Sequence, residues 1–324
     1  MTPARQAGAA LLAAMLTVAL VATFAAAAMW NQWRSVEVEA ADRARGQASW
    51  ILTGALDWSR LILREDARAG GADHLAEPWA VPLMEARLST FLAADPSNTV
   101  DNDADTTFLS GEIVDMQALL NVTNLVEAGR LSEPGLRSFS RLFELLGLPQ
   151  QQLTRMAENL RFASDISLEN RSASQAPLLP QRLEQLAWLG LPPDTIAALQ
   201  PHVTILPTRT AVNLNTAGAE VIYAVGNTLG MADAQRLVTE RERQHFRAVA
   251  DATRLLPAPG DAFASGTVDY RSRYFEVRGR LRMDGVVIEE RSLVRRDGGG
   301  NVRTVQREHG GFQSSFVAPQ PPPR

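Results

Sequence analysis

The sequence predicts an α+β fold in which one long N-terminal helix packs on an antiparallel sheet that is interrupted by a large all-helical insert. Residues 9–30 are apolar except for Thr17 and Thr23. Residues 116–206 contain several short segments with the periodicity of helices. Residues 271–306 alternate apolar and polar side chains around Asp284-Gly285, which is a strong hairpin signal. Along the chain, these three patterns predict the long helix, then the helical insert, then the C-terminal strands of the sheet.

The apolar run is long enough to cross a membrane. No charged residue lies between Arg5 and Arg34, and a 22-residue helix spans about 33 Å, against about 30 Å for a hydrocarbon core. The run alone leaves two interpretations open, a permanent anchor or a cleavable signal cut near the small residues 26–28. The short leader ends at Gly8, ahead of the run, where an ordinary signal peptidase would not cut. This position favours the anchor.

The helical pattern continues beyond the run. Apolar or small residues recur at steps of three and four, with charged residues on the other faces. We therefore expect one helix over residues 9–66, with its second half amphipathic against a globular body, and Gly70-Gly71 ending it. The members of the expected face are Trp33, Val36, Ala40, Ala44, Ala48, Ile51, Ala55, Trp58 and Ile62.

Composition excludes several classes of function. The 324 residues contain no cysteine, which excludes thiol catalysis, disulfides and cysteine-ligated zinc. The net charge of −4 gives no overall basic field for nucleic acid. The four histidines are scattered, and no HExxH, GxSxG or P-loop pattern occurs. A scaffold or assembly protein is favoured over an enzyme.

An acidic stretch at residues 95–107 follows an expected short helix at 83–92 and precedes an expected strand at 110–115. Its Asp101, Asp103 and Asp105 alternate with small residues, a spacing that can wrap carboxylates around calcium. The stretch lacks the glycine and the distal glutamate of an EF-hand loop, so a solvated acidic turn is the alternative interpretation.

The expected insert contains helical segments at 117–129, 133–146, 150–163, 181–189 and 193–200. Residues 212–255 resemble a helix-hairpin-helix unit, with Thr216 as the expected N-cap and a turn at 226–230. Such hairpins can direct backbone N–H groups at a DNA phosphate. Here a packing or protein-contact module is favoured, because basic residues are offset by acidic ones: Arg236, Arg241, Arg243 and Arg247 by Glu220, Asp233, Glu240 and Glu242.

The C-terminal region is predicted to form strands at 271–283, 286–296 and 301–306. One face of these strands is expected to pack on the long helix and the other to be exposed to solvent. The proline-rich end, residues 310–324, is expected to be disordered.

Taken together, several stretches resemble the type II secretion system protein K family of minor pseudopilins. They are the leader ending in Gly8, the apolar helix, residues 110–125 (SGEIVDMQALLNVTNL), residues 212–217 (VNLNTA) and residues 268–277 (VDYRSRYFEV). The resemblance implies a pseudopilin fold with an all-helical insert. Its expected divisions are a leader at 1–8, a transmembrane part at 9–30, a first pseudopilin part at 31–115, the insert at 116–265, a C-terminal β part at 266–309 and a tail at 310–324.

The resemblance also implies processing and partners. A prepilin peptidase would cleave after Gly8, and the new terminus Ala9 would be N-methylated. The chain would then sit in the bacterial inner membrane with its bulk in the periplasm. It would cap the pseudopilus tip with minor pseudopilins I and J, in contact with other pseudopilins and inner-membrane assembly components. Calcium binding is known in the family, and no nucleic acid is expected.

One position distinguishes this chain from most pilins. Pilins generally carry a glutamate at the fifth mature position, where it is thought to pair with a neighbouring subunit's terminal amine; here that position is Ala13. A charge in lipid is costly without a partner, and a tip subunit has no subunit ahead of it to supply one. The competing hypothesis is a membrane-anchored helix-hairpin-helix protein that binds DNA in a competence-like system.

Overall fold

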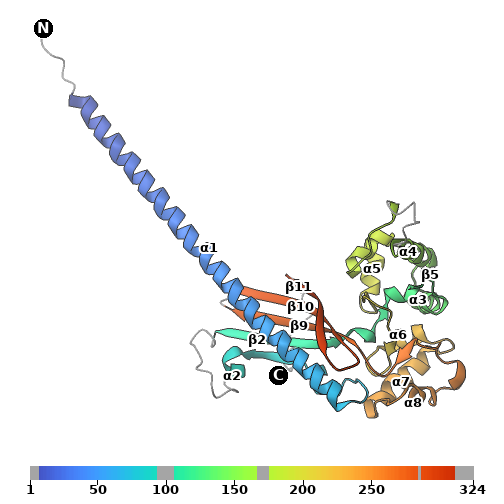
Figure 1. Cartoon of the computed structure of the whole chain (residues 1–324). Helices are drawn as coiled ribbons and strands as arrows, with labels where there is room; N and C mark the ends of the chain where they lie inside the picture. Colours follow the sequence, from blue (N-terminus) through green and yellow to red (C-terminus); the bar gives the residue numbers. More distant parts are fainter. Residues whose placement is uncertain (1–6, 93–105, 166–174, 284–285, 311–324) are drawn as a thin grey trace, which may run out of the picture. The chain divides into compact units, whose positions relative to one another are not determined.

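The computed structural model describes residues 7–92, 106–165, 175–283 and 286–310 (Figure 1). Its contacts divide the chain into two compact units, Met1–Gly54 and Ala55–Arg324. The expected calcium ligands Asp101, Asp103 and Asp105 lie outside the described residues, as does the expected tail beyond residue 310.

Helix α1 (Ala7–Ala69) is the longest element of the chain (Figure 1). It contains a stretch long and apolar enough to cross a membrane, with a mean hydropathy of 2.3 and none of that stretch buried. Trp30 is the last residue of the apolar run and Trp33 follows it, with ring centroids 5.5 Å apart. Gly70 and Gly71 have φ values of 68° and 123°, which favour glycine and end the helix. The long N-terminal helix is therefore confirmed.

Five antiparallel strands form the main sheet, in the order β1-β2-β9-β10-β11. β2 pairs with β9 so that Ile113 lies opposite Val277, and β9 pairs with β10 so that Val277 lies opposite Ser292. The strands nearest the centre of the sheet thus come from both sides of the insert. Their bounds are β1 (Leu83–Arg87), β2 (Thr107–Asp115), β9 (Tyr274–Met283), β10 (Val286–Arg296) and β11 (Val302–His309).

The last turns of α1 pack on one face of this sheet (Figure 1). Leu56 and Leu63 share a core with Trp79, Phe275 and Val294, together with Val277 and Val302. Burying a leucine or phenylalanine side chain contributes roughly 1.5–3 kcal/mol, so this cluster stabilises the packing of the helix on the sheet.

The buried face of α1 differs from the expected one. Trp58 is 61% exposed, and Trp33 and Val36 are more than half exposed, whereas Leu52 and Leu56 are buried. The stripe proposed from the sequence is therefore wrong for these three residues. Apolar residues occupy more than one face of this helix, so their spacing did not identify the covered one.

The insert between β2 and β9 has its own hydrophobic core, which includes Phe139, Leu142, Met156, Leu189 and Ile222. In its described residues it is mainly but not purely helical, because it contains the two-stranded pairings β3-β6, β4-β5 and β7-β8. Its helices are α3 (Glu133–Leu145), α4 (Gln150–Ala163), α5 (Pro193–Leu199), α6 (Ala219–Val225), α7 (Met231–Arg243) and α8 (Val249–Thr253), with 3-10 turns η3 (Met116–Ala118), η4 (Val122–Leu125), η6 (Leu183–Leu189) and η7 (Pro259–Asp261). The short strands are β3 (Leu120–Asn121), β4 (Val126–Glu127), β5 (Arg130–Leu131), β6 (Val203–Thr204), β7 (Val212–Asn213) and β8 (Val268–Asp269).

Three local expectations are corrected. Residues 83–92 form strand β1 and then the short helix α2 (Leu88–Leu92), because β1 pairs with β2. Residues 117–129 alternate 3-10 turns and two-residue strands in place of a helix. The N-cap of α6 is Gly218 and not Thr216, because the Thr216 hydroxyl donates to the Asp115 carboxylate.

Candidate functional site: the polar junction of sheet and insert

Asp115 lies where the chain leaves β2 for the insert, and its carboxylate gathers four donors from both parts of the fold. Oδ2 accepts hydrogen bonds from Thr216 Oγ1 and Ser272 Oγ, both at 2.6 Å, and from Asn213 Nδ2 at 3.1 Å. Oδ1 accepts from the backbone N–H of Gln117 at 2.8 Å. One side chain thus joins β2 to the start of the hairpin unit and to the segment that precedes β9.

The Asp115 carboxyl is 3% exposed, and this burial raises its pKa from 3.8 to about 6, although the hydroxyl and backbone donors act in the opposite direction. Desolvation disfavours the charged form of a carboxylic acid, whereas hydrogen bonds to the carboxylate favour that form.

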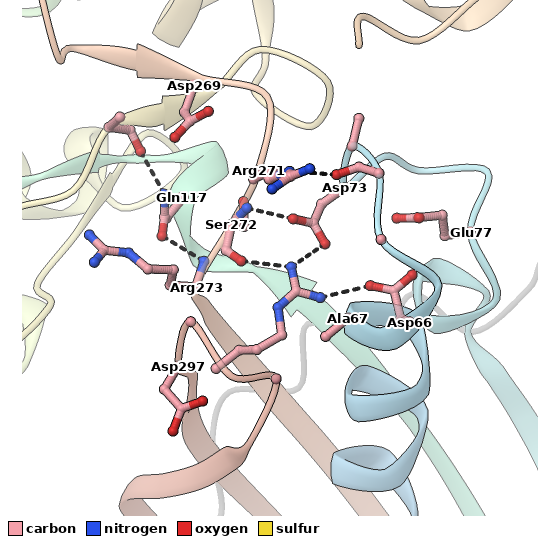
Figure 2. Close-up of a pocket in the computed structure, with 17 residues that line it drawn as sticks. Asp66, Ala67, Asp73, Glu77, Gln117, Asp269, Arg271, Ser272, Arg273 and Asp297 are labelled. Atoms are coloured by element: carbon pink, nitrogen blue, oxygen red, sulfur yellow. Dashed lines mark hydrogen bonds and ion pairs between the residues drawn. The ribbon is translucent and has the colours of Figure 1, made fainter. Parts of the chain in front are cut away.

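Arg296, at the end of β10, forms a second centre of the junction. Figure 2 labels its partners Asp66, Asp73 and Ser272. Its guanidinium pairs with Asp66 of α1 at 2.7 Å and with Asp73, and it donates to the Ser272 carbonyl at 2.8 Å. Asp73 also accepts from the Ser272 backbone N–H at 2.6 Å. Burial raises the pKa of both aspartates, and the Arg296 charge opposes that rise. This buried network fixes the end of α1 against β10.

Two asparagines and one glutamine of the insert also form hydrogen bonds at the junction. Asn213 is fully buried, and its amide Nδ2 faces the Asp73 carbonyl, Asp115 Oδ2 and Ser272 Oγ at 2.9–3.1 Å. Asn215 bonds both backbone groups of Phe246, at 2.8 and 2.9 Å. The Gln117 amide accepts from the Arg273 N–H and donates to the Ala211 carbonyl. The polar groups of the junction thus find partners inside the protein.

Three stretches singled out from the sequence meet at this junction. Asp115 and Gln117 belong to residues 110–125, Asn213 and Thr216 to residues 212–217, and Ser272 to residues 268–277. The sequence identified these stretches but gave no role to their polar side chains. Their meeting depends on pairings between residues more than 90 positions apart.

An open pocket of about 350 Å³ lies beside the junction (Figure 2). It is lined by Gly70, Gly71, Asp269, Arg271 and Asp297 among others. Arg271 crosses its rim to donate to the Gly71 carbonyl at 2.6 Å.

The carboxylates of Asp66, Asp73 and Glu77 lie at this pocket, with oxygens within 4.8 Å of one another, a grouping that hard cations favour. Arg296 already supplies a cation to two of them, and Glu77 accepts from the His74 N–H and from Trp79 Nε1. These residues therefore do not fit a calcium site, and we assign no ion to them.

The hairpin of α6 and α7 does not offer its donors to a phosphate. The Gly226 N–H bonds Ile222 within α6, the Asn227 N–H bonds the Ala262 carbonyl, and the Gly230 N–H bonds the Asp233 carboxylate. The Asp233 carboxylate thus occupies the N-terminal end of α7, where an external anion would bind.

Two arginines near the hairpin are also engaged within the chain. Arg141 lies over the Tyr223 ring at 4.1 Å and donates to the Leu229 carbonyl, while Arg241 donates to the carbonyls of Leu214 and Ala217. These contacts support packing as the role of the hairpin.

Gly8, the expected cleavage position, lies within α1, and Ala13, the position of the missing pilin glutamate, is exposed on its surface. The Ala13 carbonyl accepts from the Thr17 hydroxyl at 2.6 Å. Cleavage after Gly8 and methylation of Ala9 stay predictions.

Comparison with known proteins bears on the whole chain. Residues 118–208 and 212–269 each match a family model described as type II secretion system protein K. These matches support the identification of the chain as a type II secretion system protein K. Family members are components of a secretion system, and this chain is accordingly a minor pseudopilin of that system. The alternative of a DNA-binding protein is not favoured.

Individual relatives of the protein K family match over nearly their full length. Protein K of Pseudomonas aeruginosa is 25% identical over 94% of this chain and 93% of its own, and protein K of Pectobacterium carotovorum is 27% identical over 96% and 98%. A chain from the crystal structure of the GspK-GspI-GspJ complex of enterotoxigenic Escherichia coli is similar in fold, with a TM-score of 0.64 at 18% identity, over 84% of this chain and 99% of that one. The α+β fold with a long N-terminal helix is thereby confirmed.

Proposed function

We propose that this minor pseudopilin caps the tip of a periplasmic pseudopilus, anchored in the inner membrane by α1 until it is assembled. The observation that carries the proposal is Ala13. At the fifth position after the proposed cleavage site the exposed helix surface presents a methyl group and no carboxylate. A subunit without that charge can lead a fibre, because it needs no terminal amine from a subunit ahead of it.

The insert supports the same role. It has its own core and is tied to the sheet through Asp115, Asn213 and Arg296. A bulky, fixed body at the end of a fibre blocks the addition of another subunit. We propose a structural and not a catalytic role for it.

The partners we propose are minor pseudopilins of the I and J types, because the solved complex similar in fold contains GspI and GspJ with GspK. Immunogold labelling of sheared pseudopili, with an antibody against the insert, tests the position. We expect label at one end of each fibre. Label along the fibre length would show that the chain is a shaft subunit.

Processing has a separate test. We propose that a prepilin peptidase removes residues 1–8 and that Ala9 is then N-methylated. Intact-mass measurement of the chain from membranes is expected to give the mass of the chain without residues 1–8, plus one methyl group. The Gly8→Leu variant is expected to retain the leader. A mature chain that lacks residues 9–28 would contradict the anchored role.

A further inference from the structure

Two histidines that are far apart in the sequence stack on each other at the edge of the insert. His74 lies in the segment between α1 and β1, and His245 lies between α7 and α8 of the insert. Their ring centroids are 3.8 Å apart, and their ring planes differ by 9°. The two parallel rings thus form a contact between the insert and the segment that follows α1.

The backbone next to each ring is bonded to the same short segment, residues 213–215. The carbonyl of the residue before His74 accepts from Asn213 Nδ2 at 3.1 Å. The backbone of the residue after His245 exchanges two hydrogen bonds with the Asn215 side chain, at 2.8 and 2.9 Å. These bonds hold the two rings in register.

The surroundings of His74 favour its neutral form. Its Nδ1 accepts from the Ala76 N–H at 3.3 Å, so the single proton of the neutral ring is on Nε2, which lies 4.0 Å from a Glu77 oxygen. A second proton has to go on Nδ1, where it would face the Ala76 N–H donor. Protonation of His74 therefore breaks a bond that holds its ring in place.

The charges around the rings decide how easily each ring takes up a proton. Among the described residues, the charged groups near the two rings are Asp66, Asp73, Glu77, Arg247 and Arg296. Burial is the largest cause that lowers the pKa of His74 and of His245 below the usual 6.5. The two aspartates oppose this change at His74, but Arg296 pairs with both of them. At His245, a charged His74 and then Arg247 lower the pKa further.

We propose that the His74–His245 stack is an acid-sensitive latch between the insert and the segment that follows α1. Two neutral rings stack favourably, and a single proton is tolerated because a cation is attracted to the face of an aromatic ring. Two protons would place like charges 3.8 Å apart. The latch is therefore closed while the rings are neutral and opens when both are charged.

The sign of the pH dependence follows from proton binding. An unfolded chain takes up these protons near pH 6.5, whereas the closed stack resists them, so the closed stack loses stability as the pH falls below 6.5. Asn213 still bonds the Asp115 carboxylate when the rings separate. Opening thus frees the end of α7 without unfolding the junction. This inference does not depend on the position of the chain in a fibre.

Spin labels test the opening directly, because the chain contains no cysteine. Leu75→Cys and Arg243→Cys place nitroxides on the two sides of the stack, and both native side chains are more than half exposed. In the full chain in detergent, the dipolar broadening seen at about pH 7.5 is expected to fall by about half or more at about pH 5. Unchanged broadening over this range overturns the proposal.

His245→Phe is the matched variant for this experiment. Phenylalanine keeps a stacked ring but takes up no proton, so we expect the broadening to persist at about pH 5. His202→Gln, which replaces a histidine outside the stack, is the control and is expected to open as the wild type does. If His245→Phe also opens, another group causes the change and the inference is wrong. Asp115→Asn is expected to open normally, and loss of opening in it would assign the effect to that carboxyl and overturn the latch.

Histidine titration by NMR measures the coupling between the two rings. The chain has four histidines, so labelled histidine gives few signals to assign. We expect the His74 and His245 signals to titrate below pH 6.5, with midpoints roughly one unit or more apart, because the first proton hinders the second. His74→Gln is expected to raise the His245 midpoint. A His245 midpoint unchanged by this substitution would overturn the inference, as would a shift of both signals on adding zinc, which would show a metal-binding pair.

Discussion

Replacing Asp115 by asparagine tests whether the charge of this residue stabilises the junction. Its carboxyl is almost fully buried, and burial raises its pKa to about 6. Asparagine has the same shape, keeps an oxygen to accept from the Gln117 N–H, and never ionises. The new amide can donate to the Thr216 and Ser272 hydroxyls, so only the bond from Asn213 loses its acceptor. The substitution thus removes the charge while it preserves most of the packing.

The expected pH dependence follows from proton binding. The folded chain holds the Asp115 proton up to about pH 6, whereas an unfolded chain releases it near 3.8. The stabilising contribution of this group is therefore complete below about pH 3.8 and is lost as the pH rises through about 6. At about 1.4 kcal/mol per pKa unit, the loss is about 3 kcal/mol. Between about pH 4 and about pH 7, we expect the wild type to lose roughly this amount relative to Asp115→Asn.

Urea unfolding of the full chain in detergent, followed by tryptophan fluorescence at several pH values, measures this difference. Asp297→Asn is the control. Backbone hydrogen bonds lower the pKa of Asp297, so its contribution is lost only as the pH falls below 3.8. Its difference from the wild type should stay constant over the same range. If the wild type instead gains stability relative to Asp115→Asn as the pH rises, the four donors outweigh burial and the reasoning is wrong.

Three further predictions concern stability. Arg296→Gln is expected to lower the free energy of unfolding by about 3–5 kcal/mol in urea, because it leaves Asp66 and Asp73 buried without their cation. Gly135→Ala is expected to lower it by about 1–3 kcal/mol, because the new Cβ would meet the backbone carbonyl of Asn124. We propose that Asp101, Asp103 and Asp105 hold a calcium ion, as the family resemblance implies; adding a chelator is then expected to lower the melting temperature, because an ion at 100 times its Kd would contribute about 2.7 kcal/mol.

Each of these predictions has a matched control. Arg295→Gln removes an exposed neighbour of Arg296, and an equal loss from both variants would contradict the role of the buried pair. Gly46→Ala adds a methyl group in open space, and a loss equal to that of Gly135→Ala would contradict the steric explanation. Restoring calcium after the chelator should restore the melting temperature, and an unchanged midpoint throughout would count against a structural ion.

Elements with a strong period were predictable from the sequence. The long helix, α3, α4, α7 and the strands after the insert follow from apolar spacing and from the turn signal at Asp284-Gly285. Residues 117–129 were not predictable in this way. The Asp115 and Asn121 side chains accept from the backbone N–H groups of Gln117 and Thr123, two residues onward in each case. These local bonds compete with helix formation and give 3-10 turns.

The junction was not predictable in detail, because no local pattern brings its residues together. Asp115 and Ser272 are 157 positions apart, and Asp73 and Arg296 are 223 apart. The sequence shows the polar residues and the strand periods, but strand register and the path of the insert decide which side chains meet. Thr216 illustrates the limit. Its hydroxyl suits a helix N-cap, yet it bonds the buried Asp115 carboxylate, a partner 101 positions away that no local pattern identifies.

The two ends of the insert explain why a carboxylate is placed at the junction. The chain enters the insert after Asp115 and returns to the sheet just beyond Ser272, and these two side chains bond each other at 2.6 Å. An insert joined to a sheet at two adjacent points can pivot about them unless further contacts resist. Asn213 supplies such a contact to Asp115, and the Arg182–Glu308 ion pair at 2.6 Å adds another to β11. Buried polar contacts accept few geometries, so they hold an orientation where apolar packing alone would tolerate sliding. A fibre cap needs that fixed orientation, and this need accounts for an ionisable group whose burial costs stability near neutral pH.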